Sequence, residues 1–247
     1  MKIVTLNVWR YFEWKNRKDK VIDFLKKQKA DIIFLQEVAY DDRLKDKWRN
    51  QVEEINKALK YKNIFYGKLR DMIKWHQEPI SWKMHYGLGI LTNYPITKRK
   101  LVILPHVELD KNFGFLYMEL QTPKGKLDII NVHLENTDGG SKEQLKYILS
   151  WCEKREIKPI IAGDFNMRIT SNLKLATDNY NISYFIKPYK SFMPSTHTTT
   201  KIPITLDYIM AHKNKFGILS IKCIKNKISD HYPLLAKIII QNKKSEV

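Results

Sequence analysis

The sequence predicts an α/β fold in which two packed, mainly antiparallel sheets are flanked by helices. Helical patterns occur early and in the middle of the chain, always beside strand patterns, and the second half is antiparallel in character. A chain of 247 residues is also long enough to bury a substantial core. We expect a single domain over residues 1–240, followed by a polar tail at 241–247.

The first 35 residues have the pattern of a β-α-β unit. Residues 3–8 form a short strand-like stretch, and residues 17–29 place apolar side chains at helical spacing among lysines. The apolar run at 31–35 is continuous, which is typical of a strand covered on both faces.

The next segment combines an amphipathic stripe with a region that lacks periodicity. Residues 41–60 carry apolar side chains along one stripe, which predicts a helix, and residues 63–66 predict a strand. Residues 70–86 are rich in Trp, His and Lys without a period, so we expect a loop there.

From residue 87 onward, alternating patterns predict a series of strands. Residues 123–125 indicate a hairpin turn, and residues 141–155 predict a helix with Ser141 as its N-cap. Residues 168–204 predict irregular structure. The expected strands are 88–92, 98–104, 113–121, 126–134, 159–162, 205–211, 216–222 and 233–240.

The charge of the chain favours a polyanionic partner. Its 44 basic and 26 acidic residues give a formal net charge of +18, which attracts nucleic acid or an anionic membrane face. Only eight of the basic residues are Arg, however, and a chain rich in Lys, Ile and Asn is also typical of an AT-rich genome. Cys152 and Cys223 belong to no Cys/His cluster, which argues against a zinc site or a disulfide framework.

The sequence carries no membrane or secretion signal. No apolar stretch approaches the roughly 20 residues that a membrane-spanning helix needs, and the N-terminus lacks the pattern of a signal peptide. We therefore expect a cytoplasmic protein without stable membrane association. The sequence indicates no oligomeric state.

Polar side chains follow the ends of several predicted strands. A sandwich whose strands end at one edge would gather these groups into a single cleft. Glu37 follows an apolar strand and is a suitable ligand for a hard divalent cation, and Asn7 can orient a bound water or a carboxylate. A lone Glu or Asn at a strand end is more often a surface or turn residue, so each candidate depends on the others.

Two further segments carry a stronger chemical signal. Gly163-Asp164-Phe165-Asn166 closes a buried strand and can present a carboxylate and a carboxamide to one pocket, although the same residue types also form ordinary turns. His231 is a candidate general base, with Asp230 or Asp207 as the carboxylate that fixes its tautomer.

Taken in chain order, these segments make the sequence similar to the endonuclease/exonuclease/phosphatase superfamily, the fold of deoxyribonuclease I and exonuclease III. The match covers residues 3–238, and although each motif alone is common, seven motifs in order are specific. The motifs are Leu6-Asn7, Leu35-Gln36-Glu37-Val38, Gly87-Leu88-Gly89-Ile90-Leu91, Asn131-Val132-His133-Leu134, Gly163-Asp164-Phe165-Asn166, Leu206-Asp207-Tyr208-Ile209 and Ser229-Asp230-His231.

The resemblance implies a four-layer α/β sandwich and Mg²⁺- or Mn²⁺-dependent hydrolysis of a phosphoester. The metal set that it implies is Glu37, with Asn7 beside it, and Asp230 in support. The catalytic set is His231 as general base, Asp207 as its orienting partner, Asp164 and Asn166 as the pair that positions water and phosphate, and His133 as a stabiliser of phosphate charge.

The motifs leave the subfamily open. Asn7 is not followed by the Gly and Arg of apurinic endonucleases, and the Trp-Cys-Asp-Arg run of inositol polyphosphate 5-phosphatases is absent. No extension like the membrane-binding ones of neutral sphingomyelinases is visible. Residues 133–137, 163–168 and 231–235 are partly similar to tyrosyl-DNA phosphodiesterases of the second type.

A candidate substrate-binding surface lies within residues 70–86. Trp75, Trp82 and Lys83 interleave aromatic and basic side chains, as a surface that stacks bases and contacts phosphates does. The same aromatic side chains would also suit packing beneath a long loop. Arg168, which closes the 163–168 segment, is the fourth candidate for contact with the substrate.

The leading hypothesis is a metal-dependent phosphodiesterase acting on nucleic acid, with DNA favoured over RNA, as a nuclease or a DNA end-processing enzyme. The alternative is a phosphatase or phospholipase-like hydrolase of the same superfamily, acting on sphingomyelin or inositol phosphates. A non-catalytic scaffold would have lost a metal ligand or the base, and the chain retains both.

Overall fold

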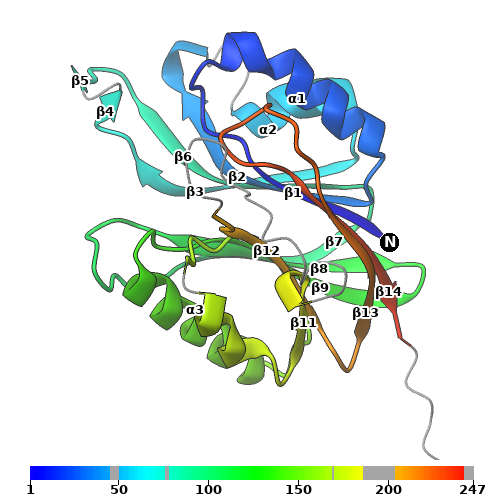
Figure 1. The fold of residues 1–247 in the computed structure, drawn as a ribbon. Coiled ribbons are helices and arrows are strands. Elements are labelled where there is room, and N and C mark those ends of the chain that lie inside the picture. The colour runs from blue at the N-terminus through cyan, green and yellow to red at the C-terminus, as the bar shows by residue number, and fades with distance from the viewer. Residues whose placement is uncertain (45–49, 76–77, 169, 186–203, 242–247) are drawn as a thin grey trace, which may run out of the picture.

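A computed structural model of the chain describes residues 1–44, 50–75, 78–168, 170–185 and 204–241. Two six-stranded sheets lie face to face, with helices on the outer side of each (Figure 1). The first sheet has the order β13 (Phe216–Cys223), β14 (Leu234–Ile240), β1 (Lys2–Asn7), β2 (Ile32–Asp41), β6 (Met84–Thr92) and β3 (Asn63–Asp71). The second has the order β11 (Tyr180–Ile182), β12 (Asp207–His212), β10 (Ile160–Asp164), β9 (Gly125–His133), β8 (Gly114–Thr122) and β7 (Ile96–Ile103).

The two sheets share one pattern of strand directions. Each has a single parallel pair at its centre, β1 with β2 in the first and β9 with β10 in the second, and every other pairing is antiparallel. A parallel pair needs a crossover connection. Helix α1 (Trp14–Gln28) supplies the first crossover and helix α3 (Asp138–Glu153) the second.

Three layers of apolar side chains hold the sandwich together. Ile3, Phe34 and Ile90 of the first sheet meet Leu116 and Ile129 of the second in the central core. A second cluster joins the outer face of the second sheet to α3, and a third joins the first sheet to α1 and α2 (Gln51–Leu59). The predicted four-layer α/β sandwich with mainly antiparallel sheets is confirmed. The assignment of residues 1–240 to a single domain stays a prediction.

Several local predictions were wrong. Residues 70–86 are not a loop: β3 extends to Asp71, β6 begins at Met84, and a small hairpin of β4 (Lys74–Trp75) and β5 (Glu78–Pro79) lies between them. The N-cap of α3 is Thr137 rather than Ser141, because the Thr137 side chain accepts a hydrogen bond from Gly140. The short helices η1 (Asp42–Leu44), η2 (Thr170–Ala176) and η3 (Ser183–Phe185) complete the described elements.

One predicted strand is longer in the structure, and some predicted segments fall outside the described residues. The strand expected at 31–35 continues to Asp41, so Glu37 lies inside β2. The helix expected at 41–60 is represented by η1 and α2, with residues 45–49 outside the described ranges. Residues 186–203, in the predicted irregular stretch, and residues 242–247, in the predicted tail, are also outside them.

Bulges in β2 and β3 face the same part of β6. The register of β2 against β6 shifts between Leu35 and Val38, and that of β3 shifts between Lys68 and Arg70. Gly87 pairs with both strands at these shifts, and a Cβ atom there would lie 1.8 Å from the carbonyl oxygen of Gly67. A bulge re-aims the side chains of the strand that carries it. Only glycine therefore fits the place where both strands bend.

Asn131 joins the two sheets through hydrogen bonds in the buried core. Its Nδ2 donates to the carbonyl oxygens of Leu35 and Gly89, both at 2.9 Å, and its Oδ1 accepts from Nε2 of Gln36 at 2.6 Å. Buried polar groups need such partners, so this bridge fixes β9 against the bulge of β2.

Within the described residues, no helix is both long and apolar enough to cross a bilayer.

Candidate active site

The carboxyl ends of the two parallel strand pairs meet at one edge of the sandwich. Asn7 ends β1, His133 ends β9 and Asp164 ends β10, while Glu37 lies just beyond the paired end of β1. Ligands in α/β sheets bind at the carboxyl ends of parallel strands. The topology therefore brings four sequence-predicted residues together, although they come from distant parts of the chain.

Asp164 occupies the centre of this group. Its Oδ2 accepts a hydrogen bond from Nδ2 of Asn7 at 3.0 Å and lies 3.7 Å from Nε2 of His133 and 3.8 Å from Nε2 of His231. Its Oδ1 accepts from the backbone N–H of Asn166 at 2.9 Å. The carboxylate is held from both sheets, and burial raises its pKa despite the two imidazoles beside it.

The backbone around Asp164 requires the motif's glycine and asparagine. Gly163 has φ 144°, and a Cβ atom there would lie 2.2 Å from the carbonyl oxygen of Val132. Asn166 adopts a left-handed φ of 50°, a conformation that Asn tolerates better than most residues. Its Nδ2 donates to the carbonyl oxygen of Leu134 at 2.8 Å, which ties the turn to the end of β9.

The structure chooses between the two candidate partners of His231. Nδ1 of His231 lies 2.7 Å from Oδ2 of Asp207, at hydrogen-bonding distance, so Asp207 rather than Asp230 orients the ring. Burial opposes protonation, but the charges of Asp207 and Asp164 outweigh it and raise the pKa of His231 well above 6.5. The two carboxylates therefore favour the protonated form of the imidazole, whose Nε2 lies on the side of Asp164.

The pKa of His133 is shifted in the opposite direction from that of His231. Burial lowers its pKa below the usual value, although Asp164 and Glu37 act in the opposite direction. Its Nδ1 is buried and has no hydrogen-bond partner among the described residues. An unsatisfied buried nitrogen at a site of this kind is suited to a hydrogen bond with a bound ligand or water.

Asp230 lies next to His231 but has a different environment. Its Oδ1 accepts from the hydroxyl of Ser229 at 3.1 Å, and the same hydroxyl lies 2.6 Å from the carbonyl oxygen of Asn7. Burial raises the pKa of Asp230 to about 6, and the nearby charges of Glu37 and Asp164 add to the rise. Three carboxylates thus influence one another at this edge of the sandwich.

Glu37 lies in the bulge of β2 with a left-handed φ of 51°. Its Oε2 forms an ion pair with Nε of Arg10 at 2.7 Å. Burial opposes ionisation of Glu37, but Arg10 and the histidines hold its pKa below the usual value, so it remains a carboxylate. Left-handed non-glycine residues cluster at functional sites, because the surrounding structure must offset their strain.

Arg17 fixes the loops that carry these side chains. This buried residue lies in α1 and donates from Nη1 to the carbonyl oxygens of Val8 at 3.2 Å and Ile228 at 2.8 Å. Its Nε donates to the carbonyl oxygen of Phe12 at 2.9 Å. The segment after Asn7 and the segment before Asp230 are therefore anchored to one guanidinium.

The donor set fits a hard divalent cation near Glu37 and Asp230. Mg²⁺ and Mn²⁺ prefer carboxylate oxygens. Burial raises the pKa of Asp230 to about 6, and the charge of Glu37 adds to the rise, so a cation would stabilise both carboxylates. Asp164, Asp207 and His231 also bring ligand atoms within 4.8 Å of one another. That second group already has internal hydrogen bonding, since Nδ1 of His231 is paired with Asp207.

Asn7 is placed differently from the other predicted metal ligands. Its Oδ1 accepts from the backbone N–H of Trp9 at 3.0 Å, and its Nδ2 donates to Asp164. Both atoms of the amide are therefore in use, and the side chain holds Asp164 in position. Its role as a metal ligand stays a prediction.

The four predicted substrate-binding residues come from three parts of the fold. Trp82 is partly buried, with the guanidinium of Arg43 3.9 Å from its ring. Lys83 is exposed, and its carbonyl oxygen accepts from the N–H of Asp42. Arg168 is exposed at the rim, two residues beyond Asn166, and Trp75 lies in β4 with its side chain outside the described part. Their contact with substrate stays a prediction.

Three residues next to the site were missed from the sequence. Arg10 pairs with Glu37, Arg17 anchors two loops, and Arg70 lies between the rings of Tyr86 and Phe113. The scarcity of Arg among the basic residues was the sequence signal that could have identified these three residues. In a chain with 44 basic residues, a buried Arg is a more specific feature than any Lys.

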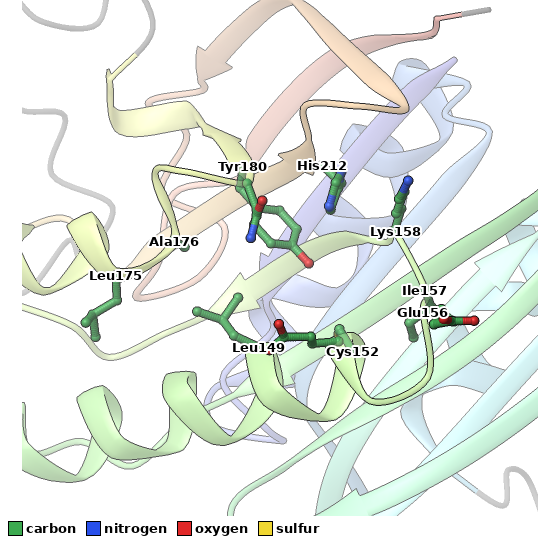
Figure 2. A pocket seen from close by; sticks show the side chains of 11 residues that line it. Leu149, Cys152, Glu156, Ile157, Lys158, Leu175, Ala176, Tyr180 and His212 are labelled. Carbon is green, nitrogen blue, oxygen red and sulfur yellow. The ribbon is translucent and has the colours of Figure 1, made fainter. Parts of the chain in front are cut away.

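The cavity in Figure 2 lies away from this site. It has a volume of about 620 Å³ and lies beside the end of α3, with Tyr180 and His212 at its wall. His212 ends β12 whereas Asp207 begins it, so the cavity is at the opposite end of that strand from the catalytic group. None of the sequence-predicted site residues lines it.

The model of the Endonuclease/Exonuclease/phosphatase family matches residues 4–231 of the chain. This range includes every residue of the site described above. None of the curated proteins matches the sequence significantly.

Solved structures share the fold at low sequence identity. The human Nocturnin catalytic domain with bound sulfate has a TM-score of 0.71 and 18% identity, and the match covers 98% of this chain and 93% of that one. D. rerio TDP2 complexed with a single-strand DNA product has a TM-score of 0.69 and 16% identity, with 97% and 98% covered. The mannosyl-6-phosphatase of Bacteroides thetaiotaomicron has a TM-score of 0.70 and 13% identity, with 97% and 99% covered.

Proposed function

Because the chain belongs to the Endonuclease/Exonuclease/phosphatase family, whose members hydrolyse phosphoester bonds, we propose that it is a divalent-metal-dependent phosphodiesterase acting on nucleic acid. One observation carries this proposal. Asp164, two buried imidazoles and a separate pair of carboxylates converge where the parallel strands of both sheets end. Phosphoryl transfer mainly needs positioning and charge stabilisation, which such a group supplies.

His231 and Asp207 act on the phosphate as a unit. Asp207 lies 2.7 Å from the ring and favours its cationic form, in which Nε2 can donate a hydrogen bond to a phosphate oxygen on which charge develops. His133 offers a second imidazole on the other side of Asp164.

The proton of the attacking water passes to the Asp164–His231 pair. The sequence assigns water activation to His231, and that role stays a prediction. Oδ2 of Asp164 lies 3.8 Å from Nε2 of His231. The raised pKa of Asp164 makes its carboxylate a better proton acceptor. Asn7 and the backbone N–H of Asn166 hold that carboxylate in place.

Glu37 and Asp230 would hold Mg²⁺ or Mn²⁺, which when bound neutralises phosphate charge and polarises the bond to phosphorus. Glu37 is kept ionised for this role, since its pKa lies below the usual value.

Charge supports a nucleic acid as the substrate. The net charge of +18 steers a polyanion to the surface. D. rerio TDP2, which shares the fold, has been solved with a single-strand DNA product, and this supports DNA over RNA. A nuclease and a DNA end-processing enzyme both fit, and the location in the cytoplasm stays a prediction.

A phosphatase acting on a small substrate is the second candidate. The mannosyl-6-phosphatase of Bacteroides thetaiotaomicron matches 97% of this chain, which favours it. The phosphodiesterase would act on an extended anionic substrate, whereas the phosphatase would not need one.

A substrate panel tests the proposal. Single-stranded, double-stranded, abasic and 5′-tyrosyl DNA are incubated with Mg²⁺ beside single-stranded RNA, inositol phosphates, sphingomyelin and mannose 6-phosphate. The expected result is cleavage of at least one DNA substrate, with a KM that rises steeply with salt. Turnover of the small or lipid esters alone would support the second candidate instead.

A further inference from the structure

A cavity of about 610 Å³ has in its lining Arg10, the ion-pair partner of Glu37. Its walls come from the segment after β1, from the end of β3 with the β4–β5 arm, and from the segment between β7 and β8. Figure 1 shows the arm projecting beyond the sandwich, past the ends of β3 and β6. Four cationic side chains, Arg10, Arg70, Lys74 and Lys111, line the cavity.

Arg70 is the most constrained of these cations. The bulge of β3 places it so that its Cζ lies 4.6 Å from the ring centroid of Tyr86 and 4.9 Å from that of Phe113. Its Nη1 is buried and has no hydrogen-bond partner within the described part of the chain. Burial lowers the pKa of Arg70 to about 10, so the guanidinium is still charged at neutral pH. A fixed, charged and unsatisfied donor is suited to an anion.

The cavity is joined to the catalytic group by shared side chains. Arg10 lines the cavity while its Nε contacts Oε2 of Glu37 at 2.7 Å. The rings that hold Arg70 also contact His133, with centroid distances of 6.3 Å for Tyr86 and 5.6 Å for Phe113. An anion bound at Arg70 would therefore lie next to the phosphate under attack.

The wall that carries Lys111 is held by buried hydrogen bonds. Glu135 is fully buried, and its Oε1 accepts from the backbone N–H groups of Glu108 and Leu109, both at 2.9 Å. Its Oε2 accepts from Val107 at 3.3 Å. A carboxylate with several backbone donors fixes the segment between β7 and β8. The cavity is thus bounded by structure that does not depend on a ligand.

The two acidic side chains in the lining, Asp71 and Asp110, each have a nearby partner. Asp71 forms an ion pair with Lys68 at 2.7 Å, and Asp110 lies 3.1 Å from Nδ1 of His106. The cationic groups therefore dominate the field inside the cavity. At its edge Ile73 is 76% exposed and offers an apolar surface to a sugar or base.

We propose that this cavity binds a second phosphate group of the substrate, adjacent to the one that is hydrolysed. This inference rests on the proposed function and narrows its substrate class. The enzyme selects substrates with two neighbouring phosphates, as in an oligonucleotide, over isolated phosphoesters, because Arg70 and Lys111 bind the phosphate that is not cleaved.

Three dinucleotide substrates test the selection. TpT has one phosphate, whereas pTpT and TpTp add a second phosphate on either side of the scissile bond. For the wild type, kcat/KM should be about 10- to 100-fold higher for one of the latter two than for TpT, as charge-assisted hydrogen bonds predict. In Arg70→Met the ratio of kcat/KM for the two-phosphate substrate to kcat/KM for TpT should fall toward one. Lys111→Gln alters an exposed residue and should lower the same ratio without risk to folding.

The matched control is Arg99→Met. Arg99 also lies over an aromatic ring, with its Cζ 4.6 Å from Phe65, but it does not line the cavity. Its replacement should leave the ratio unchanged. Equal kcat/KM for all three substrates in the wild type would overturn the inference and leave the phosphodiesterase function intact.

Anion binding gives a second readout that is independent of turnover. Sulfate is titrated into metal-free protein while the Arg Nε–H resonances are followed by NMR. The Arg70 signal should shift and saturate in the wild type, the Arg99 signal should not, and Lys111→Gln should weaken the response. Sulfate binding without cleavage of any nucleic acid would support the cavity and refute the proposed function. Absence of a saturable Arg70 shift would refute the cavity.

Discussion

Nδ1 of His231 and Oδ2 of Asp207 lie 2.7 Å apart, which joins the segment before β14 in one sheet to the start of β12 in the other. Both side chains are buried. The contact orients the imidazole, and the charges of Asp207 and Asp164 raise its pKa. A loop residue and a strand residue that are 24 positions apart in the sequence thus form one hydrogen-bonded pair.

Asp207→Asn should lower kcat by about 10²- to 10⁴-fold, because the imidazole loses both its orientation and the charge that keeps it cationic. KM should change little, since Asp207 is not expected to contact the substrate. Steady-state kinetics on the best DNA substrate measures both parameters. Asp128→Asn is the matched control, as Asp128 is a buried carboxylate that accepts from the hydroxyl of Tyr117 outside the site. A loss expressed only in KM would contradict the assigned role.

Glu37→Gln should weaken Mn²⁺ binding by roughly 100-fold or more, since even outer partners of metal ligands change affinity 10- to 100-fold. Isothermal titration calorimetry without substrate measures this directly. Glu119→Gln serves as the control, because Glu119 pairs with Lys98 and Lys126 away from the site. Unchanged Mn²⁺ affinity in Glu37→Gln would place the cation elsewhere, with Asp164, Asp207 and His231 as the next candidates.

Asn131→Ala should lower the free energy of unfolding by about 2 to 4 kcal/mol, because Leu35, Gly89 and Gln36 each lose a buried partner. Urea denaturation should show a lower midpoint with the same slope. Asn226→Ala, at an exposed position, should leave the midpoint unchanged. An equally stable Asn131→Ala would mean that the bridge between the sheets contributes nothing net.

His85 should make stability depend on pH below neutrality. Burial and the charges of Lys68 and Lys83 lower its pKa from 6.5 to about 4. The unfolded state therefore takes up a proton first, so this contribution is complete above pH 6.5 and is lost as the pH falls toward 4. Because the ring is only half-buried, we expect a loss of roughly 1 to 2 kcal/mol.

His85→Gln isolates that contribution. The variant should lose less stability than the wild type between pH 6.5 and pH 4, as measured by urea denaturation at each pH. His106→Gln, on an exposed segment, controls for the removal of a histidine. Parallel pH profiles for the wild type and His85→Gln would exclude the effect.

The sheets and their helices could be predicted because their signals are local. Apolar periodicity located most strands and α1, and the order of short motifs indicated the layers. The bulge at Glu37 could not be predicted, because it depends on β6 and on Gly87 opposite it. The hairpin at residues 74–79 was missed for a similar reason, since its two strands are too short to show a period.

The candidate site also contains residues that motifs predicted and residues that only the fold revealed. His231, Asp207 and Asp164 were predicted from motifs, and the resemblance already implied Asp207 as the partner of His231, which agrees with their separation of 2.7 Å in the fold. Arg10 and Arg70 carry no motif, and their position beside Glu37 and His133 follows from packing between β3, β6 and the loop after β1. Long-range contacts of this kind cannot be predicted from the spacing of motifs or from the composition of the sequence.

The central claim is that this group of carboxylates and imidazoles hydrolyses phosphodiester bonds with a divalent cation. The most direct measurement is the cleavage rate of a labelled oligodeoxynucleotide by the wild type with Mg²⁺, by the wild type with EDTA, and by Glu37→Gln and His231→Ala with Mg²⁺. The account predicts cleavage in the first case and at least a roughly 10³-fold loss in the other three. Cleavage that persists in EDTA, or in both variants, would contradict it.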